Sequence, residues 1–320
     1  MVAVSYHDTV NVLQGIAITP QGPFDRPEWF ALLADGVPSP LIVLAGDAKE
    51  VAAMPLVQSN RRLEPLRNWY AFSWRPLGSQ NPRLWQQMAS DLRQRTHRVT
   101  LSPVPDEDGS ASRLAAAFAE AGWSVHREPC DHNHVLPVQG RSFAEYWAGR
   151  PGPMRTTLKR KAKKVAVEIF ERFDPDAWDS YEAIYNESWK PEEGDPALLR
   201  RFAQAEGAAG RLRLGIARAE GEPVAAQFWT VENGTAYIHK LAHRESAKRL
   251  SAGATLSAAL FEHVIDRDKV DLIDFGTGND PYKADWMELD RPRYRIDCLD
   301  PAQPRAWPAL VKRALARKSS

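Results

Sequence analysis

The sequence predicts an α/β fold with mixed sheets, organised as two units that repeat the same order of elements. In each half, several strand-like runs are followed by a helix, a strand, a helix and a final strand. Two-residue turn signals such as Asn233-Gly234 join consecutive strands, which is typical of hairpins. The 24 prolines and 11 tryptophans exclude a simple helical bundle. No residues match at a fixed period, so the duplication would be one of fold and not of sequence.

The first half, from residue 1 to 138, is predicted to form one unit of strands and helices. Asn81 and Pro82 are typical of a helix start, and Gly122 is typical of a helix end. The expected strands are residues 10–18, 40–45, 97–101, parts of 56–75 and the extended run 123–138, and the expected helices are 26–35, 82–95 and 110–121.

The second half, from residue 139 to 320, is predicted to form the other unit. Asp174 and Asp195 each precede a proline and are expected to cap helices. The expected strands are residues 165–173, 211–219, 223–232, 235–243, 271–275 and 293–299, and the expected helices are 142–147, 154–164, 175–189, one beginning near 195, 252–268 and 304–316.

Composition limits the classes of function. The chain is 43% hydrophobic and 26% charged, which is ordinary for a soluble globular protein. Its net charge of +1 does not favour DNA as a partner, so any basic surface must be local. The chain has no run of roughly 20 apolar residues and no signal-peptide pattern at its start, so we expect a cytoplasmic protein without a membrane span. Cys130 and Cys298 are too few to suggest a disulfide framework or a metal site.

A run of small residues, Arg249-Leu250-Ser251-Ala252-Gly253-Ala254-Thr255, opens directly into a predicted helix. Small residues let backbone N–H groups approach phosphate oxygens at a helix N-terminus, where the helix dipole also favours an anion. The sequence therefore predicts a phosphate site here. An ordinary helix start capped by Ser251 is the alternative interpretation.

A second motif is the helix expected over residues 154–164, which has six cations and no acid. Its apolar residues recur at helical spacing, so one face packs while the rest is positive. A solvated helix face is one interpretation. A surface for polyanions such as nucleotide phosphates or tRNA is the other, and the repulsion between so many like charges favours it.

The second half resembles the GNAT acyltransferase superfamily, and more narrowly the tandem-GNAT branch of CelD-type and FemAB-like proteins. The resemblance covers roughly residues 140 to 300. It depends on the basic helix, Glu187-Ser188-Trp189, the hairpin Gly221-Glu222-Pro223-Val224-Ala225-Ala226, the strand 237–243 with the loop after it, and Asp274-Phe275-Gly276-Thr277-Gly278 with Tyr282-Lys283 and Trp286. The resemblance implies two tandem units, each a central mixed sheet flanked by helices, with a degenerate first unit.

The resemblance further implies transfer of an acyl group from acyl-coenzyme A to an amine or hydroxyl of a small or cell-envelope-related acceptor. The small-residue run, from Arg249 to Thr255, would bind the donor. We expect the substrate to contact four side chains, which are Arg155, Lys159, Trp189 and Lys283. No metal is implied, and His132-Asn133-His134 lacks the spacing of a zinc site.

Three side chains are candidates for proton transfer. Tyr282 would protonate the leaving thiolate, and either Asp274 or His239 would act as base. His239 and His243 are four residues apart on one predicted strand, so both are expected on one face. The alternatives are that Asp274 caps a turn and that Tyr282 packs under the sheet.

Two other functions remain open at this stage. FemAB-like relatives take an amino acid from charged tRNA, which the basic helix would bind. The low glycine content of the loop instead favours a binding or scaffold protein that has lost catalysis.

Overall fold

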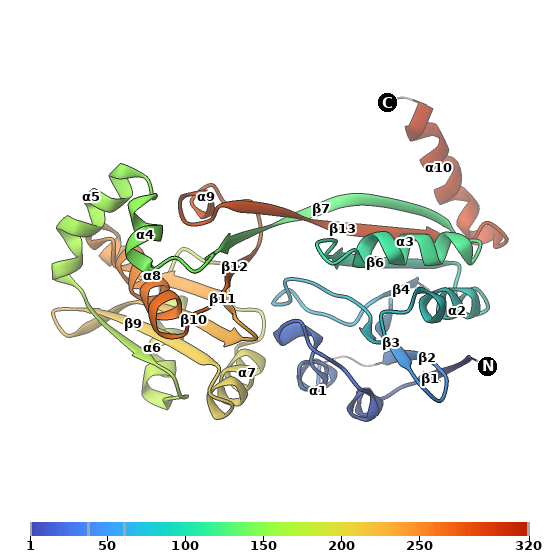
Figure 1. Ribbon diagram of the computed structural model, residues 1–320, viewed down its shortest axis with the longest axis horizontal. Coiled ribbons are helices and arrows are strands. Elements are labelled where there is room, and N and C mark those ends of the chain that lie inside the picture. The colour runs from blue at the N-terminus through green and yellow to red at the C-terminus, as the bar shows by residue number, and fades with distance from the viewer. Residues whose placement is uncertain (1, 37–38, 60–61, 319–320) are drawn as a thin grey trace. The chain divides into compact units, whose positions relative to one another are not determined.

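The computed structural model describes residues 2–36, 39–59 and 62–318, and the chain divides into two compact units (Figure 1). One unit contains Met1–His132 and Arg291–Ser320, and the other contains Asn133–Asp290. The sequence-based division left everything after residue 138 in the second unit. The final strand and helix instead belong to the first unit, because β13 (Leu289–Leu299) pairs with β6 (Arg98–Val104).

The first unit has the strand order β1-β2-β3-β4-β6-β13-β7, with β5 beside β3. Its other strands are β1 (Ala3–His7), β2 (Pro40–Gly46), β3 (Val51–Ser59), β4 (Arg62–Pro65), β5 (Leu77–Gly78) and the first part of β7 (Ser124–Pro137). Its helices are α1 (Pro27–Ala34), α2 (Pro82–Leu92), α3 (Ser110–Glu120) and α10 (Trp307–Lys318). Helices α2 and α3 cover one face of the sheet, where Leu63, Trp85, Leu101 and Phe118 share the core.

The second unit has the strand order β7-β12-β11-β10-β9-β8. Its strands besides β7 are β8 (Ala166–Phe170), β9 (Leu212–Ala219), β10 (Glu222–Glu232), β11 (Thr235–His243) and β12 (Leu272–Thr277). Its helices are α4 (Phe143–Ala148), α5 (Gly152–Lys161), α6 (Pro175–Asn186), α7 (Pro196–Ala208), α8 (Ala252–Glu262) and α9 (Lys283–Trp286).

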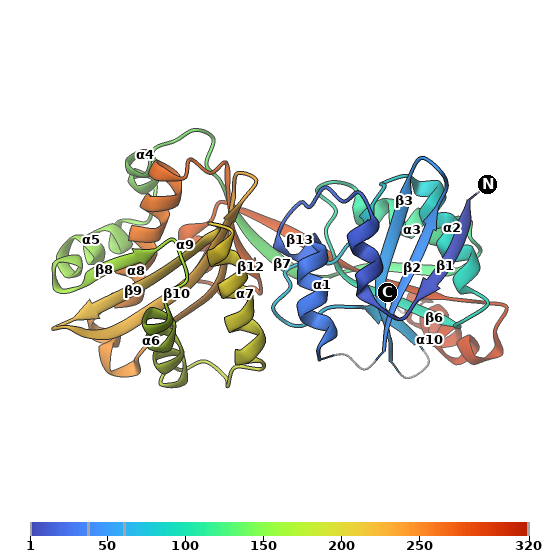
Figure 2. The same cartoon turned by 90° about the horizontal axis from the view of Figure 1, so that it is seen from below.

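Helices cover both faces of the second sheet (Figures 1 and 2). Phe228 contacts Trp178 of α6 and Phe202 of α7, while the next residue, Trp229, contacts Phe261 of α8. Successive residues of a strand point to opposite faces, so α6 and α7 lie against one face and α8 against the other.

The two units share one pattern of strand pairing. In each, four strands pair antiparallel in chain order, β1 to β4 and β8 to β11. The fourth strand then pairs parallel with the next main strand, β6 or β12, across helix α2 or α8. The expected mixed-sheet fold and its internal duplication are therefore confirmed.

Helix caps follow the sequence signals. The side chains of Asn81, Asp174 and Asp195 accept hydrogen bonds from backbone N–H groups in the first turns of α2, α6 and α7. Asn233 and Gly234 both have positive φ angles, 48° and 71°, as a two-residue hairpin turn requires.

The strand expected over residues 10–18 is wrong. Val10–Gly15 form a 3-10 helix, and the Thr9 side chain accepts a hydrogen bond from Asn11 N–H at its start. The buried residues Val10 and Leu13 are three apart, which matches the period of this helix and not that of a strand.

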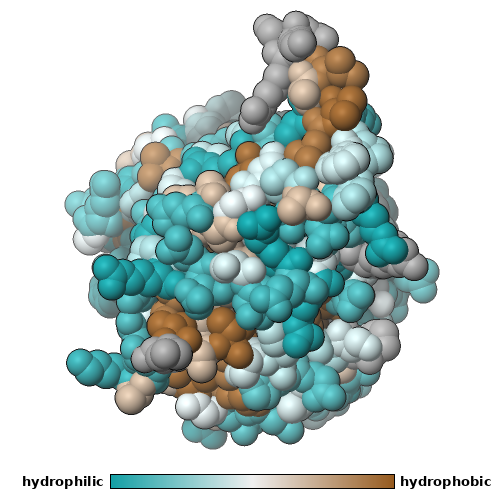
Figure 3. Space-filling model, turned by 90° about the vertical axis from the view of Figure 1, so that its right-hand side faces the viewer, coloured by the Kyte–Doolittle hydropathy of each residue, from teal (hydrophilic) through white to brown (hydrophobic). Residues whose placement is uncertain are grey.

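Helix α10 has an apolar stripe, visible as brown side chains beside the grey C-terminal residues in Figure 3. Trp307, Val311 and Leu315 recur at every fourth position and are each more than half exposed. No helix among residues 2–36, 39–59 and 62–318 is long and apolar enough to cross a membrane.

Candidate active site

The parallel strands β11 and β12 of the second unit pair over a short distance and then part. Their register joins Thr235 to Leu272, Ala236 to Ile273 and Tyr237 to Asp274. β11 continues to His243 and β12 to Thr277 beyond this register. The parallel pairing of β11 with β12 therefore ends at Tyr237 and Asp274, and both strands continue past that point.

Helix α8 begins just after β11 and has no side-chain cap. Ser251 occupies the N-cap position, but it has left-handed φ and ψ angles of 53° and 37° and makes no cap hydrogen bond. The first helical amides, those of Ala252, Gly253 and Ala254, have no intrahelical acceptor. The interpretation of Ser251 as an ordinary cap is therefore wrong, and this helix start has the properties of an anion site.

Lys161 lies at this helix start. The Lys161 ammonium, from the end of α5, donates to Ser251 Oγ at 3.0 Å. Its positive charge adds to that of the helix dipole, and the two together favour a phosphate. The sequence identified α5 as a basic helix but selected Arg155 and Lys159 in place of Lys161.

The first turn of α8 is fixed to the sheet by a buried glutamine. Gln227 Nε2 donates to the Gly253 carbonyl at 3.1 Å and to Ser257 Oγ at 2.7 Å. Thr255 Oγ1 donates to the Ser251 carbonyl at 3.2 Å. These bonds hold the turn in place before any ligand arrives.

Arg249 lies at the surface, at the end of the 3-10 turn Glu245–Leu250 that leads into α8. Arg155 and Lys159 of α5 are also exposed. Their predicted roles in binding remain predictions.

A β-bulge separates the two histidines of β11. Phe228 pairs with Lys240 and Trp229 with Ile238, so His239 is the extra residue. His239 lies among Phe202, Phe228 and Tyr237, on the α6–α7 side, and shares a 2.8 Å hydrogen bond with Thr230.

His243 lies on the α8 side of the sheet. A β-carbon built on Gly253 would be 3.7 Å from its Nδ1 atom. The expectation that His239 and His243 share a face is wrong, because a bulge reverses the alternation of side chains.

Asp274 is buried, and one of its carboxylate oxygens accepts two hydrogen bonds. Its Oδ1 accepts from Asn133 Nδ2 and from Gly276 N–H, both at 2.7 Å. These bonds fix β7, β12 and the turn after β12. The geometry favours the turn-capping alternative, in which Asp274 positions the loop that leads to Tyr282.

Lys283 is buried at the start of α9, directly after that loop. Its ammonium donates to the Thr277 carbonyl at 2.5 Å and lies 5.4 Å from the centre of the Phe275 ring. These contacts give Lys283 a positioning role.

Tyr282 and Trp189 are the exposed aromatic residues among the candidates. Tyr282 is 38% exposed and meets Phe275 edge to face. Burial of part of the phenol and the nearby Asp280 carboxylate raise the pKa of Tyr282 to about 12. Tyr282 therefore keeps its proton at neutral pH, as an acid must.

Trp189 is 47% exposed, and its ring centre lies 4.3 Å from that of His243. Burial lowers the pKa of His243, and the nearby Lys248 and Lys190 add to this shift while Glu245 opposes it. His243 is therefore neutral at pH 7.

The structure contains a buried ion pair that the sequence analysis did not identify. Lys240 Nζ lies 3.0 Å from Glu193 Oε1, and the two side chains are 9% and 7% exposed. Burial lowers the pKa of Lys240 to about 8, although Glu193 opposes the shift. The only sequence signal is that Lys240 lies inside a predicted strand, between Ile238 and Leu241.

Replacement of Lys240 by Met tests this environment. The folded pKa of about 8 lies below the ordinary value of 10.5, so the unfolded chain binds more protons between these pH values. The wild type should therefore gain stability relative to Lys240→Met as pH rises through this window. Urea unfolding at several pH values measures the difference, and a difference that falls or stays constant would contradict the lowered pKa.

No group of three or more His, Cys, Asp or Glu side chains in the described part of the chain is arranged to hold a metal ion.

Part of the second unit is similar to a known protein family. Residues 153–284 match the family described as acetyltransferase (GNAT) domain. A search of curated proteins found no match to the chain.

Several solved structures have the same fold. FemX is similar with a TM-score of 0.64 and 9% identity, over 92% of this chain and 98% of that one. The C-terminal DUF2156 domain of a putative lysylphosphatidylglycerol synthetase from Agrobacterium fabrum is similar with a TM-score of 0.62 and 15% identity, over 96% of each chain. A tandem GNAT protein from the clavulanic acid biosynthesis pathway has a TM-score of 0.51 and 12% identity, over 92% of this chain and 98% of that one.

Residues 153–284 of the second unit thus match the GNAT acetyltransferase family, and the chain as a whole has the fold of tandem GNAT proteins. The predicted resemblance to GNAT proteins is confirmed, and the chain shares its fold with FemX.

Proposed function

We propose that the second unit transfers an acyl group from acyl-coenzyme A to an amine or hydroxyl acceptor. The main support is the uncapped start of α8, with Lys161 beside it, between the parallel strands β11 and β12, whose pairing ends at Tyr237 and Asp274. The pyrophosphate of the donor would accept hydrogen bonds from the amides of Ala252, Gly253 and Ala254 and would pair with Lys161.

In the proposed reaction, the acceptor nitrogen or oxygen bonds to the acyl carbon and the carbon–sulfur bond breaks. Neutral His243 would take the proton of the acceptor, and Tyr282 would give its proton to the leaving thiolate. Asp274 and His239 would act as positioning residues, because their polar atoms already make hydrogen bonds within the fold.

Titration calorimetry with acetyl-coenzyme A and longer acyl-coenzyme A species tests the donor. Binding of at least one species in a one-to-one ratio is expected. If none of these species binds, the proposal that acyl-coenzyme A is the donor is wrong. The likeness to a lysylphosphatidylglycerol synthetase domain supports a cell-envelope acceptor, which an assay of released thiol with candidate amines and lipids would identify.

A charged tRNA is the second candidate donor, supported by the likeness to FemX and by α5. Arg155, Lys159, Arg160, Lys163 and Lys164 are exposed, and none of them pairs with a carboxylate within the residues that the structure describes.

The variant Arg155→Glu/Lys159→Glu/Lys163→Glu should weaken tRNA binding by more than about tenfold in a gel shift, since each lost phosphate contact reduces a salt-dependent attraction. A matched control reverses the charge of Lys49, Arg83 and Lys269, which are exposed elsewhere. If the two variants bind tRNA with equal affinity in the gel shift, the result counts against a tRNA donor.

A further inference from the structure

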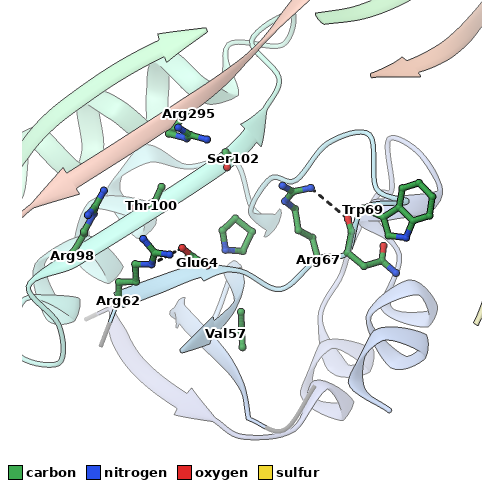
Figure 4. A pocket seen from close by; sticks show the side chains of 11 residues that line it. Val57, Arg62, Glu64, Arg67, Trp69, Arg98, Thr100, Ser102 and Arg295 are labelled. Atoms are coloured by element: carbon green, nitrogen blue, oxygen red, sulfur yellow. Dashed lines mark hydrogen bonds and ion pairs between the residues drawn. The ribbon is translucent and has the colours of Figure 1, made fainter. Parts of the chain in front are cut away.

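The first unit has a pocket of about 540 Å³ (Figure 4). Its lining includes four arginines, one glutamate and one tryptophan, which are Arg62, Arg67, Arg98, Arg295, Glu64 and Trp69. Figure 4 shows Arg62, Arg98 and Arg295 on one side and Arg67 with Trp69 on the other. The volume falls within the roughly 300–1,000 Å³ of small-molecule sites.

The pocket forms where the parallel strands of this unit part. β4 and β6 pair at one position, Leu63 with Val99. Both of these side chains belong to the core beneath α2 and α3. Because side chains alternate along a strand, their neighbours Arg62 and Arg98 project from the opposite face.

This pocket is not a second copy of the proposed donor site. Helix α2 occupies the place in the first unit that α8 has in the second. Its N-terminus is capped, because Asn81 Oδ1 accepts from Arg83 N–H at 3.0 Å. The groups that would bind an anion in this pocket are therefore the side chains that line it.

The four arginines differ in how far their N–H donors are already used. Arg62 and Arg98 are paired with carboxylates, whereas Arg67 and Arg295 keep most of their donors. Arg62 pairs with Glu64 at 2.7 Å, and Arg98 donates to Asp297 at 2.9 and 3.2 Å. Arg295 has only a long contact of 3.8 Å with Glu128, and both side chains are about half exposed.

Arg67 has no carboxylate within ion-pair distance in the described ranges, and it donates to the Asn68 carbonyl at 3.4 Å. A guanidinium has five N–H donors in a planar fork that matches phosphate. Arg67 and Arg295 are therefore available for a ligand.

Trp69 adds a flat surface beside these charges. It is 53% exposed, and its ring centre lies 4.8 Å from that of Tyr70. A ring of a ligand can stack on such an exposed indole.

We propose that this pocket binds a small molecule with a phosphate group, held by Arg67 and Arg295, and a ring that stacks on Trp69. A nucleotide and a sugar phosphate share this chemistry. The proposal does not depend on the transfer reaction proposed for the second unit.

Titration calorimetry with uridine diphosphate, glucose 1-phosphate and inorganic pyrophosphate tests the proposal. We expect either uridine diphosphate or glucose 1-phosphate to bind. The one that binds more tightly shows whether the ligand is a nucleotide or a sugar phosphate. Arg67→Gln/Arg295→Gln should weaken its binding by more than about tenfold, because two charge-assisted hydrogen bonds are lost. Trp69→Ala should weaken the binding of the ring-bearing ligand several-fold and leave the binding of pyrophosphate unchanged.

Lys161→Gln is the control for the donor site and should leave this binding unchanged. Failure of both ring-bearing phosphates to bind would overturn the proposal, as would binding that Lys161→Gln removes or that Arg67→Gln/Arg295→Gln leaves intact. If Trp69→Ala weakens the binding of pyrophosphate and of the ring-bearing ligand equally, Trp69 does not stack on a ligand ring. Thermal unfolding of each variant confirms that the surface changes leave the fold intact.

Discussion

Replacement of Lys161 by Gln is expected to weaken the binding of acyl-coenzyme A by roughly ten- to a hundredfold. The Lys161 ammonium donates to Ser251 Oγ at the uncapped start of α8, so the variant removes a full positive charge from the proposed phosphate site. A charge-assisted hydrogen bond contributes about 1.5–3 kcal/mol, and each 1.4 kcal/mol corresponds to about tenfold in affinity. Calorimetric dissociation constants measure the effect.

Lys163→Gln is the matched control, because Lys163 is an exposed lysine just two residues further along the chain. The control should bind the donor as the wild type does. If both variants bind with the same affinity, Lys161 does not contact the donor.

Asp274 gives the second large effect, because Asp274→Ala and Asp274→Asn should behave differently. The alanine variant leaves the buried amide groups of Asn133 and Gly276 without their acceptor. The free energy of unfolding should fall by about 2–4 kcal/mol, since an unsatisfied buried donor costs about 1–3 kcal/mol. The asparagine variant keeps an oxygen acceptor and should lose less than about 1.5 kcal/mol.

Transfer activity then separates positioning from catalysis at this residue. A positioning role predicts that Asp274→Asn keeps most of the wild-type kcat and an unchanged pH profile. Loss of activity in Asp274→Asn together with a wild-type Tm would show that Asp274 is the base.

Local signals in the sequence predicted much of the fold. Caps such as Asn81 and Asp174 act over a single helical turn, and the turn Asn233-Gly234 acts between adjacent residues, so each is visible in a short segment. The small-residue run before α8 was recognisable for the same reason, since small residues before a helix form a local pattern.

Non-local pairing was not visible in the sequence. The C-terminal strand β13 pairs with β6, almost two hundred residues earlier in the chain (for example Asp297 with Thr100), and no local pattern specifies that partner. The division into units after residue 138 therefore placed this strand in the wrong unit.

The candidate site depended on two further features of tertiary structure. The bulge at His239 reverses the side-chain alternation of β11, although the surrounding residues have an ordinary strand pattern. Lys161 is one of six cations between residues 155 and 164, and its contact with Ser251 distinguishes it. Both features depend on how the strands and helices pack.

Hydrogen exchange at the start of α8 tests the central claim most directly. The backbone amides of Ala252, Gly253 and Ala254 have no intrahelical acceptor, so they should exchange quickly in the free protein. Saturating acyl-coenzyme A should slow their exchange by more than about tenfold, which corresponds to about 1.4 kcal/mol of protection, while the Asn81-capped start of α2 stays unchanged. Binding of acyl-coenzyme A without any protection of these three amides would contradict the account.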